Sequence, residues 1–400
     1  MDFGNTRQEN DTNLLTRIDA IKTGQDLSVL EPFARAYLGL FYDIDNQLPA
    51  EQRIELLANA DLAHAVKQGL MAVLYRDDLP TPDSIAQSML KQETQTVGYA
   101  VLAGMSLLTD KQADVVDDLP ALALKSSICF HHAISTFHDD NWYLPLITRK
   151  PALAAQALLS MWRELLQNKQ DFLPGLRPIL KDESLIPLFR EVAIPLLIDW
   201  PHCRKWDLYR ILARAIQYVD ASPLRDAAQI ILSDDRHVSM ANQVYWHATA
   251  FLLAPEEHVQ NMINFMGQEK IKLLPLLDFV IPLLQGHYGQ AFNLSAMGYA
   301  GLIRCLAQKF TPQIALSDSL SDVTAKVMWL FYKLACFSRE EGEGALKSLR
   351  RVRVLKLYSD IFDSIAVLQQ QTDKPDYAAF LQMLRDEGRL REKKNWHDAH

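Results

Sequence analysis

The sequence predicts an all-α protein, and three observations support this class. Apolar residues recur with helical spacing along most of the chain, whereas the period-two alternation of a β-strand is nearly absent. Glycine supplies only 15 of 400 residues, which is few for a β-rich or doubly wound protein that needs glycine at tight turns. The chain is 49% hydrophobic, so it can bury a large core and is not a mostly disordered polypeptide.

Three segments show the helical pattern most clearly. Residues 30–44 and 152–170 each place their apolar side chains on one face of a helix. Residues 321–337 are apolar around most of the circumference, as expected of a helix packed between two layers.

Prolines and capping residues mark the expected ends of these helices, because proline costs least in the first helical turn. Ser222 and Ser239 precede helical patterns as capping residues should. Pro195 and Pro282 fall inside apolar runs, so we expect kinks or breaks there. The prolines at or near expected boundaries are Pro151, Pro174, Pro187, Pro201, Pro223, Pro255 and Pro312.

Helix starts become regular between residues 184 and 284. We expect helices to begin near 184, 206, 221, 239, 255 and 269, with spacings of 33 (206 to 239) and 34 (221 to 255). This period is the size of an antiparallel helical hairpin. The pattern predicts an α-solenoid of degenerate HEAT-like or armadillo-like hairpins, and a compact multi-helix bundle is the alternative.

Breaks in the pattern divide the chain into three expected parts. These are an N-terminal helical segment (1–140), a central helical-repeat array (141–310), and C-terminal helices with a basic stretch and a charged tail (311–400). The breaks lie at 137–151, "FHDDNWYLPLITRKP", and at 308–319, "QKFTPQIALSDS".

Charge and cysteine usage indicate a soluble cytoplasmic protein. The net charge of −8 does not favour binding to nucleic acid or to an anionic membrane, both of which are negatively charged. The four cysteines are far apart and unpaired in spacing, as in a protein with reduced thiols. The polar N-terminus is no signal peptide, and no apolar stretch is long enough to cross a bilayer.

Several motifs of enzymes are missing from the sequence. It contains no phosphate-binding G-x-x-x-x-G-K-[ST] loop, no G-x-G-x-x-G, no H-E-x-x-H, no C-x-x-C and no G-x-S-x-G. We therefore expect no catalytic residues and no cofactor.

The stretch "SSICFHHAISTFHDDNW" (126–142) is the strongest candidate for chemistry. Only Cys129 and His132 have the spacing of a helical metal pair. The doublet at His138 and Asp139 is similar to the His-Asp doublet of HD-type phosphohydrolases. We expect a polar helix end with an Asp-rich turn. The alternative is a metal-dependent hydrolase whose ligands include His131, His138 and Asp139.

Candidate residues for partner binding follow from residue type, because aromatic and arginine side chains dominate binding hot spots. The basic run at 346–358 also carries an apolar stripe, so a solvated helix with one buried face is its simpler explanation. The candidates are Trp206, Arg210, Trp246, Lys347, Arg350, Arg351 and Arg353.

The middle of the chain resembles a known family. The stretches "LPGLRPILKDESLIPLFREVAIPLLIDWP" (173–201), "LYRILARAIQYVDASPLRDA" (208–227) and "SMANQVYWHATAFLLAPEEHV" (239–259) look like the helical-repeat region of bacterial NACHT-type NTPases. These are STAND proteins, several of which act in anti-phage defence, and their array serves for sensing or assembly. This chain has no Walker loop, so no ATPase residue is carried over. It would be a fragment of a longer chain or a stand-alone relative.

Three functions remain open on the sequence. We expect first a non-enzymatic scaffold or sensor module that binds a protein partner across several repeats, in a bacterial setting of anti-phage defence. The second is the all-α metal-dependent hydrolase that would use residues 129–140. The third is a HEAT-like nucleic-acid-binding protein, which the net charge disfavours. The partner and the oligomeric state stay open.

Overall fold

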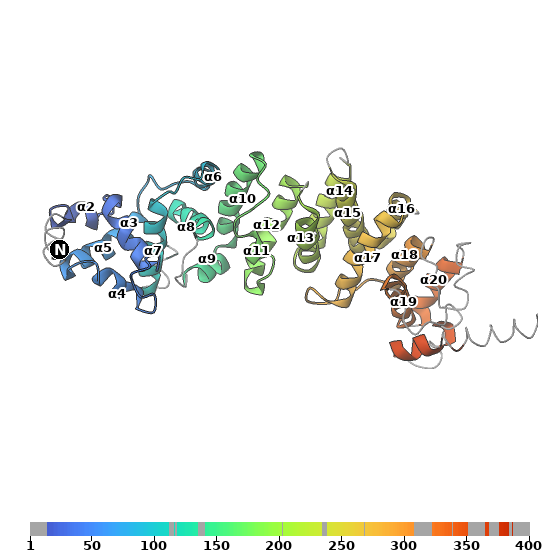
Figure 1. Ribbon diagram of the computed structural model, residues 1–400. Coiled ribbons are helices and arrows are strands. Elements are labelled where there is room, and N and C mark those ends of the chain that lie inside the picture. Colours follow the sequence, from blue (N-terminus) through green and yellow to red (C-terminus); the bar gives the residue numbers. More distant parts are fainter. Residues whose placement is uncertain are drawn as a thin grey trace, which may run out of the picture. The chain divides into compact units, whose positions relative to one another are not determined.

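The regular structure of this protein is helical throughout the part that is described. The structure is a computed structural model, and it describes residues 14–111, 116, 118–134, 141–201, 203–233, 238–267, 269–307, 322–337, 339–350, 365–367, 376–383 and 386. Helices follow one another along these residues without a strand between them (Figure 1). The predicted all-α class is confirmed.

The chain forms two compact units, Met1–Trp200 and Pro201–His400. In the first unit the helices are α2 (Ile18–Lys22), α3 (Leu27–Tyr37), α4 (Ala50–Glu55), α5 (Ala60–Val73), α6 (Pro82–Lys91), α7 (Val97–Lys111), α8 (Ala121–Ala133), α9 (Tyr143–Arg149), α10 (Pro151–Gln167), α11 (Leu176–Ile179), the short 3-10 helix η2 (Glu183–Leu185) and α12 (Ile186–Asp199). In the second unit they are α13 (Lys205–Tyr218), α14 (Ala221–Ser233), α15 (Met240–Leu253), α16 (Pro255–Met266), α17 (Lys270–Gln285), α18 (Ala296–Ala307), α19 (Asp322–Ala335) and α20 (Arg339–Arg350).

This division differs from the three parts expected at 1–140, 141–310 and 311–400. Helix α8 lies before the expected break near 140, yet it packs against α10 on the other side. Helix α18 likewise packs against α19 across the expected break near 310. Polar stretches in the sequence therefore mark loops within a unit, because the apolar faces on both sides share one core.

Most expected helix starts between 184 and 284 are confirmed to within two residues. Ser239 accepts a hydrogen bond from the Asn242 amide at 3.3 Å and caps α15. Pro151 and Pro255 occupy the first turns of α10 and α16, where their missing N–H groups cost nothing. Local sequence signals therefore set these boundaries.

The prolines inside apolar runs do not break their helices. Helix α12 continues through Pro195, and α17 continues through Pro282 as well as Pro275. An internal proline costs about 3 kcal/mol through a lost hydrogen bond and a clash. Burial offsets this cost, since Leu276, Phe279 and Leu283 of α17 are almost fully buried.

Helices of the first unit approach each other closely at two glycines. Gly69 of α5 faces the carbonyl of Ile21 at α2, and Gly104 of α7 faces the carbonyl of Leu70 on α5. A Cβ atom at either glycine would overlap the facing carbonyl oxygen. The absence of a side chain thus allows backbone to meet backbone at these two crossings.

The second unit has a regular packing order. Helices α13, α15, α17 and α19 contact one another in succession, and α16, α18 and α20 do the same. Consecutive helices α14, α15 and α16 also pack together. Within these two series, each helix thus contacts the helix two places further along the chain.

Candidate functional site

Trp206 is the most exposed tryptophan of the described residues and stands at the start of α13. Its side chain is 67% exposed, although a ring of this size is normally buried. Arg210 lies four residues further along α13 and therefore on the same helix face, and it is exposed. Arg204 and Lys205, directly before Trp206, are exposed as well. We call Arg204, Lys205, Trp206, Arg210 and Tyr288 the Trp206 patch.

Cationic and aromatic groups of this patch lie close together. The Lys205 Nζ atom is 5.8 Å from the centre of the Trp206 ring and 6.0 Å from that of Tyr245. These distances allow a weak cation–π attraction at an exposed site. The patch therefore combines apolar surface with positive charge, in a chain whose net charge is −8.

A cluster of packed aromatic rings lies between Trp206 and the core of the second unit. The Tyr209 ring centre lies 6.2 Å from that of Trp206, 5.7 Å from Tyr245 and 5.4 Å from Phe279. These rings come from α13, α15 and α17, which pack in succession. The edge-to-face angles are those that aromatic pairs prefer, so the cluster fixes the position of α13.

Hydrogen bonds hold Tyr209 in place. Its hydroxyl donates to the Asp278 carbonyl at 3.2 Å and also contacts the hydroxyl of Tyr288. Since a carbonyl can only accept, the Tyr288 hydroxyl is the donor to Tyr209. Burial, followed by this bond, raises the pKa of Tyr209 well above its ordinary value. Tyr209 is therefore a neutral structural residue at physiological pH, and it anchors Tyr288, which is 38% exposed.

The cluster also connects to α19 through charge. The Asp278 carboxylate pairs with Lys326 Nζ at 2.9 Å. Asp278 is 62% exposed and Lys326 is 23% exposed, so the pair adds an anchoring contact and little stability. Sequence reasoning did not find Tyr209, Tyr288 or Asp278, because their importance depends on contacts between residues about 70 positions apart.

The prediction that Trp246 contacts a partner is wrong. Trp246 is fully buried in α15, so its ring has no surface to offer. The physical reason is that α15 is apolar on nearly every side and lies between other helices. Trp246 belongs to the core of the second unit.

The basic stretch near the C-terminus is described only in part. Lys347 is exposed on α20, 3.5 Å from the carboxylate of Glu343, and Leu346 and Leu349 are buried on the same helix. Arg350 is the last residue of α20. Arg351 and Arg353 lie outside the described residues. Up to Arg350 the helix thus has one buried and one solvated face, and Glu343 partly neutralises Lys347.

Histidines of the 126–142 stretch pack against aromatic rings. His131 stacks on Tyr143 with ring centres 4.0 Å apart, and His132 bonds through Nε2 to the Tyr143 hydroxyl at 2.7 Å. Cys129, which is fully buried, directs its thiol toward the Ala157 carbonyl at 3.5 Å. His138 and Asp139 lie outside the described residues. Within the described residues no three potential metal ligands gather.

Burial keeps His132 neutral. Desolvation, and then the neighbouring His131, lower the pKa of His132 to about 3. Gly175, at φ +79°, leaves room for the ring, because a Cβ at this position would come within 2.7 Å of it. The pair His132 and Tyr143 therefore joins the end of α8 to the start of α9 as a packing element.

Cysteine chemistry is weak in this protein. Burial raises the pKa of the thiols of Cys129, Cys203 and Cys305 well above the ordinary value. The thiol of Cys336 also has a raised pKa, although this residue is exposed. All four thiols are thus protonated near neutral pH, and a thiol is a much poorer nucleophile than a thiolate.

Comparison with known proteins does not assign the chain to a family. No family model, no curated protein and no solved structure matches it. Among the helices that the structure describes, none combines the length and the hydropathy needed to cross a membrane.

Proposed function

We propose that this protein is a non-enzymatic interaction module that binds a protein partner through the Trp206 patch. The observation that carries the proposal is a large aromatic side chain held 67% exposed above a rigid cluster of buried rings. Exposure of a large apolar ring to water is unfavourable, so an exposed tryptophan often marks an interaction site. Tryptophan and arginine are also among the residues that contribute most to the binding energy of protein interfaces. A scaffold or sensor role agrees with the resemblance to the helical arrays of NACHT-type proteins in anti-phage defence.

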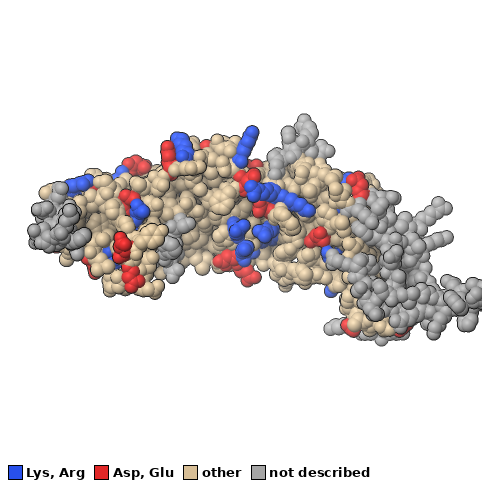
Figure 2. Space-filling view, in the orientation of Figure 1, with Lys and Arg blue, Asp and Glu red and all other residues tan. Residues whose placement is uncertain are grey.

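The chemistry of the patch indicates its partner. Arg204, Lys205 and Arg210 surround an apolar ring, so the complementary surface carries acidic residues around an apolar pocket. On the face that Figure 2 displays, basic and acidic side chains of the described residues lie interspersed. Such a mixed surface favours a protein partner over the phosphate backbone of a nucleic acid, which needs a continuous basic tract.

The helices that carry the patch form, in this proposal, an α-solenoid of stacked hairpins. The successive contacts of α13, α15, α17 and α19 and of α16, α18 and α20 support it, since hairpin repeats contact their neighbours in this order. Small-angle X-ray scattering tests it. A compact chain of 400 residues would have a radius of gyration of about 21 Å, and a solenoid a clearly larger one. A value near 21 Å would favour the bundle.

Comparative affinity capture tests the binding proposal. The full chain, its Trp206→Ala variant and its Phe172→Ala variant serve as baits in an extract of the organism that encodes it. Phe172 is 73% exposed in the first unit and provides the matched control. A specific partner is retained by the wild type and Phe172→Ala and lost by Trp206→Ala. With that partner purified, we expect Trp206→Ala to weaken binding about 30-fold or more.

Two outcomes would contradict the proposal. One is a set of retained proteins that does not differ between wild type and Trp206→Ala, while both have the same unfolding temperature. The other is tight binding of RNA or DNA that falls steeply with salt and is lost in Arg210→Glu, which would indicate a nucleic-acid-binding protein. An equal unfolding temperature is expected because substitution of a largely exposed side chain changes stability by about 0.5 kcal/mol or less.

A further inference from the structure

A pocket in the first unit has the features of a ligand site that the Trp206 patch does not share. It encloses about 400 Å³, which is within the range of small-molecule sites. Its walls come from α3, α6, α7 and α8 and from the segments after α3 and α6. All of its lining residues belong to the described part of the first unit, whereas the Trp206 patch lies in the second. A ligand site here therefore does not depend on the proposed partner binding.

Arg35 provides the positive group of the pocket. Its guanidinium carbon lies 5.5 Å from the centre of the Phe41 ring and 5.6 Å from that of Tyr99. The closest carboxylate contact among the described residues is a long one, at 3.5 Å to Glu31 on the same helix. Two rings thus hold the guanidinium in place while its side chain stays 41% exposed. A fixed guanidinium of this kind suits a planar carboxylate.

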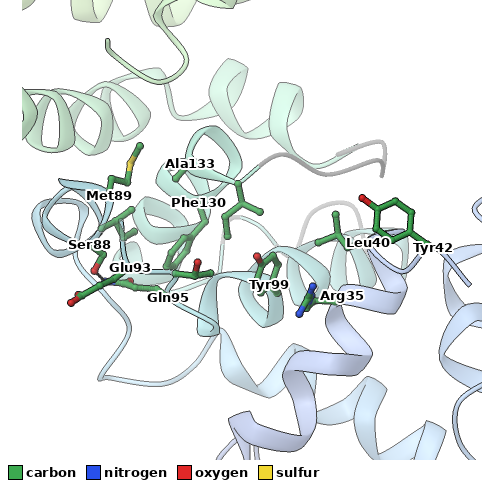
Figure 3. Close-up of a pocket in the computed structure, with 13 residues that line it drawn as sticks. Arg35, Leu40, Tyr42, Ser88, Met89, Glu93, Gln95, Tyr99, Phe130 and Ala133 are labelled. Carbon is green, nitrogen blue, oxygen red and sulfur yellow. Dashed lines mark hydrogen bonds between the residues drawn. The ribbon is translucent and has the colours of Figure 1, made fainter. Parts of the chain in front are cut away.

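The remainder of the pocket has an apolar middle and a polar far end. In Figure 3, Arg35 lies beside Tyr99 at one end, Phe130 lies in the middle, and Ser88, Glu93 and Gln95 lie at the other end. Apolar side chains of Leu40, Ile85, Met89, Ala133 and Ile134 also belong to the lining, together with Tyr42 and Thr94. A ligand with an apolar body can therefore bury that body while one end reaches Arg35.

Hydrogen bonds fix both walls in advance of any ligand. On one side, the buried Arg53 guanidinium donates to the carbonyls of Tyr37, Asn46 and Leu48 and so anchors the segment that carries Leu40. On the other, the Gln95 amide donates to the Ser88 hydroxyl at 2.6 Å and to the Ser84 carbonyl at 3.2 Å. Ordered walls lower the entropy cost of binding.

Local charge limits the ligand to a single negative charge. Arg35 is the one cationic residue of the lining, while Glu93 lies in the lining and Glu31 beside Arg35. A dianion such as a phosphate monoester would be repelled by these carboxylates. A neutral ligand would leave the Arg35 guanidinium with only its long contact to Glu31, at 3.5 Å.

We propose that this pocket binds an apolar monocarboxylate, with the carboxylate on Arg35 and the apolar body over Tyr99 and Phe130. Two sources present this chemistry, a free aryl or alkyl acid and the C-terminal carboxylate of a peptide that ends in an apolar residue. Both place one planar anion next to a hydrophobic group.

NMR titration of the full chain tests the proposal with defined probes. The free acid is 4-phenylbutyrate, and the peptide is N-acetyl-alanyl-phenylalanine. Each has its neutral amide as a control, and phenyl phosphate is the dianion. We expect saturable binding of at least one acid, with a dissociation constant of about 1 mM or tighter. The acid that binds more tightly identifies the source. The amides and phenyl phosphate bind at least about tenfold more weakly.

Variants connect the binding to Arg35. Arg35→Gln removes the charge and weakens binding of the acid about tenfold or more, and Arg35→Lys retains part of the affinity. Arg177→Gln is the matched control, since Arg177 is exposed in the same unit and outside the lining, and it leaves binding unchanged.

Three results would overturn the proposal. The first is that neither acid binds the folded wild type at about 10 mM, tenfold above the expected constant. The second is that an amide or phenyl phosphate binds as tightly as the acids. The third is unchanged affinity in Arg35→Gln. The comparison of acid and amide uses the wild type alone, so it decides the matter even if Arg35→Gln folds poorly.

Discussion

Two sets of helix contacts, one in each unit, use opposite kinds of residue. In the first unit, Gly69 and Gly104 let α5 meet α2 and α7 backbone to backbone. In the second, the rings of Tyr209, Tyr245 and Phe279 fill the space between α13, α15 and α17. The distance between packed helices depends on the side chains at the contact, so both small and large residues can form such contacts.

The aromatic contacts of the second unit extend to its surface. Backbone-to-backbone contacts leave no side chain to extend beyond the interface, whereas a cluster of rings can continue to the surface. Tyr209 is buried, and its neighbours Trp206 and Tyr288 continue the cluster into solvent. The second unit therefore combines a rigid core with an exposed aromatic edge.

The largest effect is expected when the aromatic core of the second unit is removed. Phe279→Ala deletes a fully buried ring and should lower the free energy of unfolding by about 3–5 kcal/mol. Urea denaturation measures the loss, and hydrogen exchange should locate it in α13, α15 and α17. Phe172→Ala is the control, because Phe172 is 73% exposed and its loss should cost about 0.5 kcal/mol or less. Equal losses for the two variants would mean that the ring cluster does not stabilise the unit.

A smaller loss is expected from one added methyl group in the first unit. Gly104→Ala places a Cβ atom against the Leu70 carbonyl and should cost about 1–3 kcal/mol through forced separation of α5 and α7. Hydrogen exchange should show the loss of protection in these two helices. Gly344→Ala is the matched control in α20, where a Cβ meets no atom within 4 Å. There alanine should stabilise the helix by about 0.5–1 kcal/mol. A stable Gly104→Ala variant would refute the close contact.

Acid should destabilise the first unit through His132. Its pKa is about 3 in the folded protein and near 6.5 when exposed, so the unfolded chain binds a proton that the folded chain excludes. Stability from this residue is complete above pH 6.5 and falls as the pH drops toward 3, by up to about 1.4 kcal/mol per pH unit. Urea denaturation between pH 7 and 5.5 measures the slope.

Substitution separates His132 from the other acid-sensitive groups. His132→Gln should flatten the dependence of stability on pH, and the same change at the exposed His64 should leave the wild-type slope. His247 in the second unit contributes in the same direction, since burial and then His258 and Lys272 lower its pKa to about 4. If His132→Gln leaves the pH dependence of the unfolding free energy unchanged, then His132 takes up its proton as readily in the folded protein as in the unfolded chain.

The smallest effect is expected at the anchor of the exposed edge. Tyr209→Phe removes the hydrogen bonds to the Asp278 carbonyl and the Tyr288 hydroxyl while keeping the ring, and should cost about 1 kcal/mol. Amide hydrogen exchange should become faster in the segment that carries Tyr288. Tyr75→Phe, at a tyrosine that is 52% exposed, provides the control. If Tyr209→Phe is as stable as wild type, the ring packing alone fixes the edge.

Local signals made much of the helical layout predictable. Ser239 and the prolines at 151 and 255 act within one helical turn, so they mark helix starts whatever packs around them. The helical spacing of apolar residues likewise predicted the all-α class. Pro282 shows the limit of such signals, because the burial of α17 offsets a local preference to break the helix.

Sequence by itself thus determined the helical class and most helix starts, and only the tertiary structure decided which side chains reach the surface. Trp206 and Trp246 were equal candidates by residue type, yet one is 67% exposed and the other fully buried. Helix α13 has a distinct polar side, whereas α15 is apolar on nearly every side and is enclosed by neighbours that lie far away in sequence. The role that we propose for Arg35 depends in the same way on Tyr99, which lies on another helix. Exposure and site geometry depend on such long-range contacts, which no local pattern encodes.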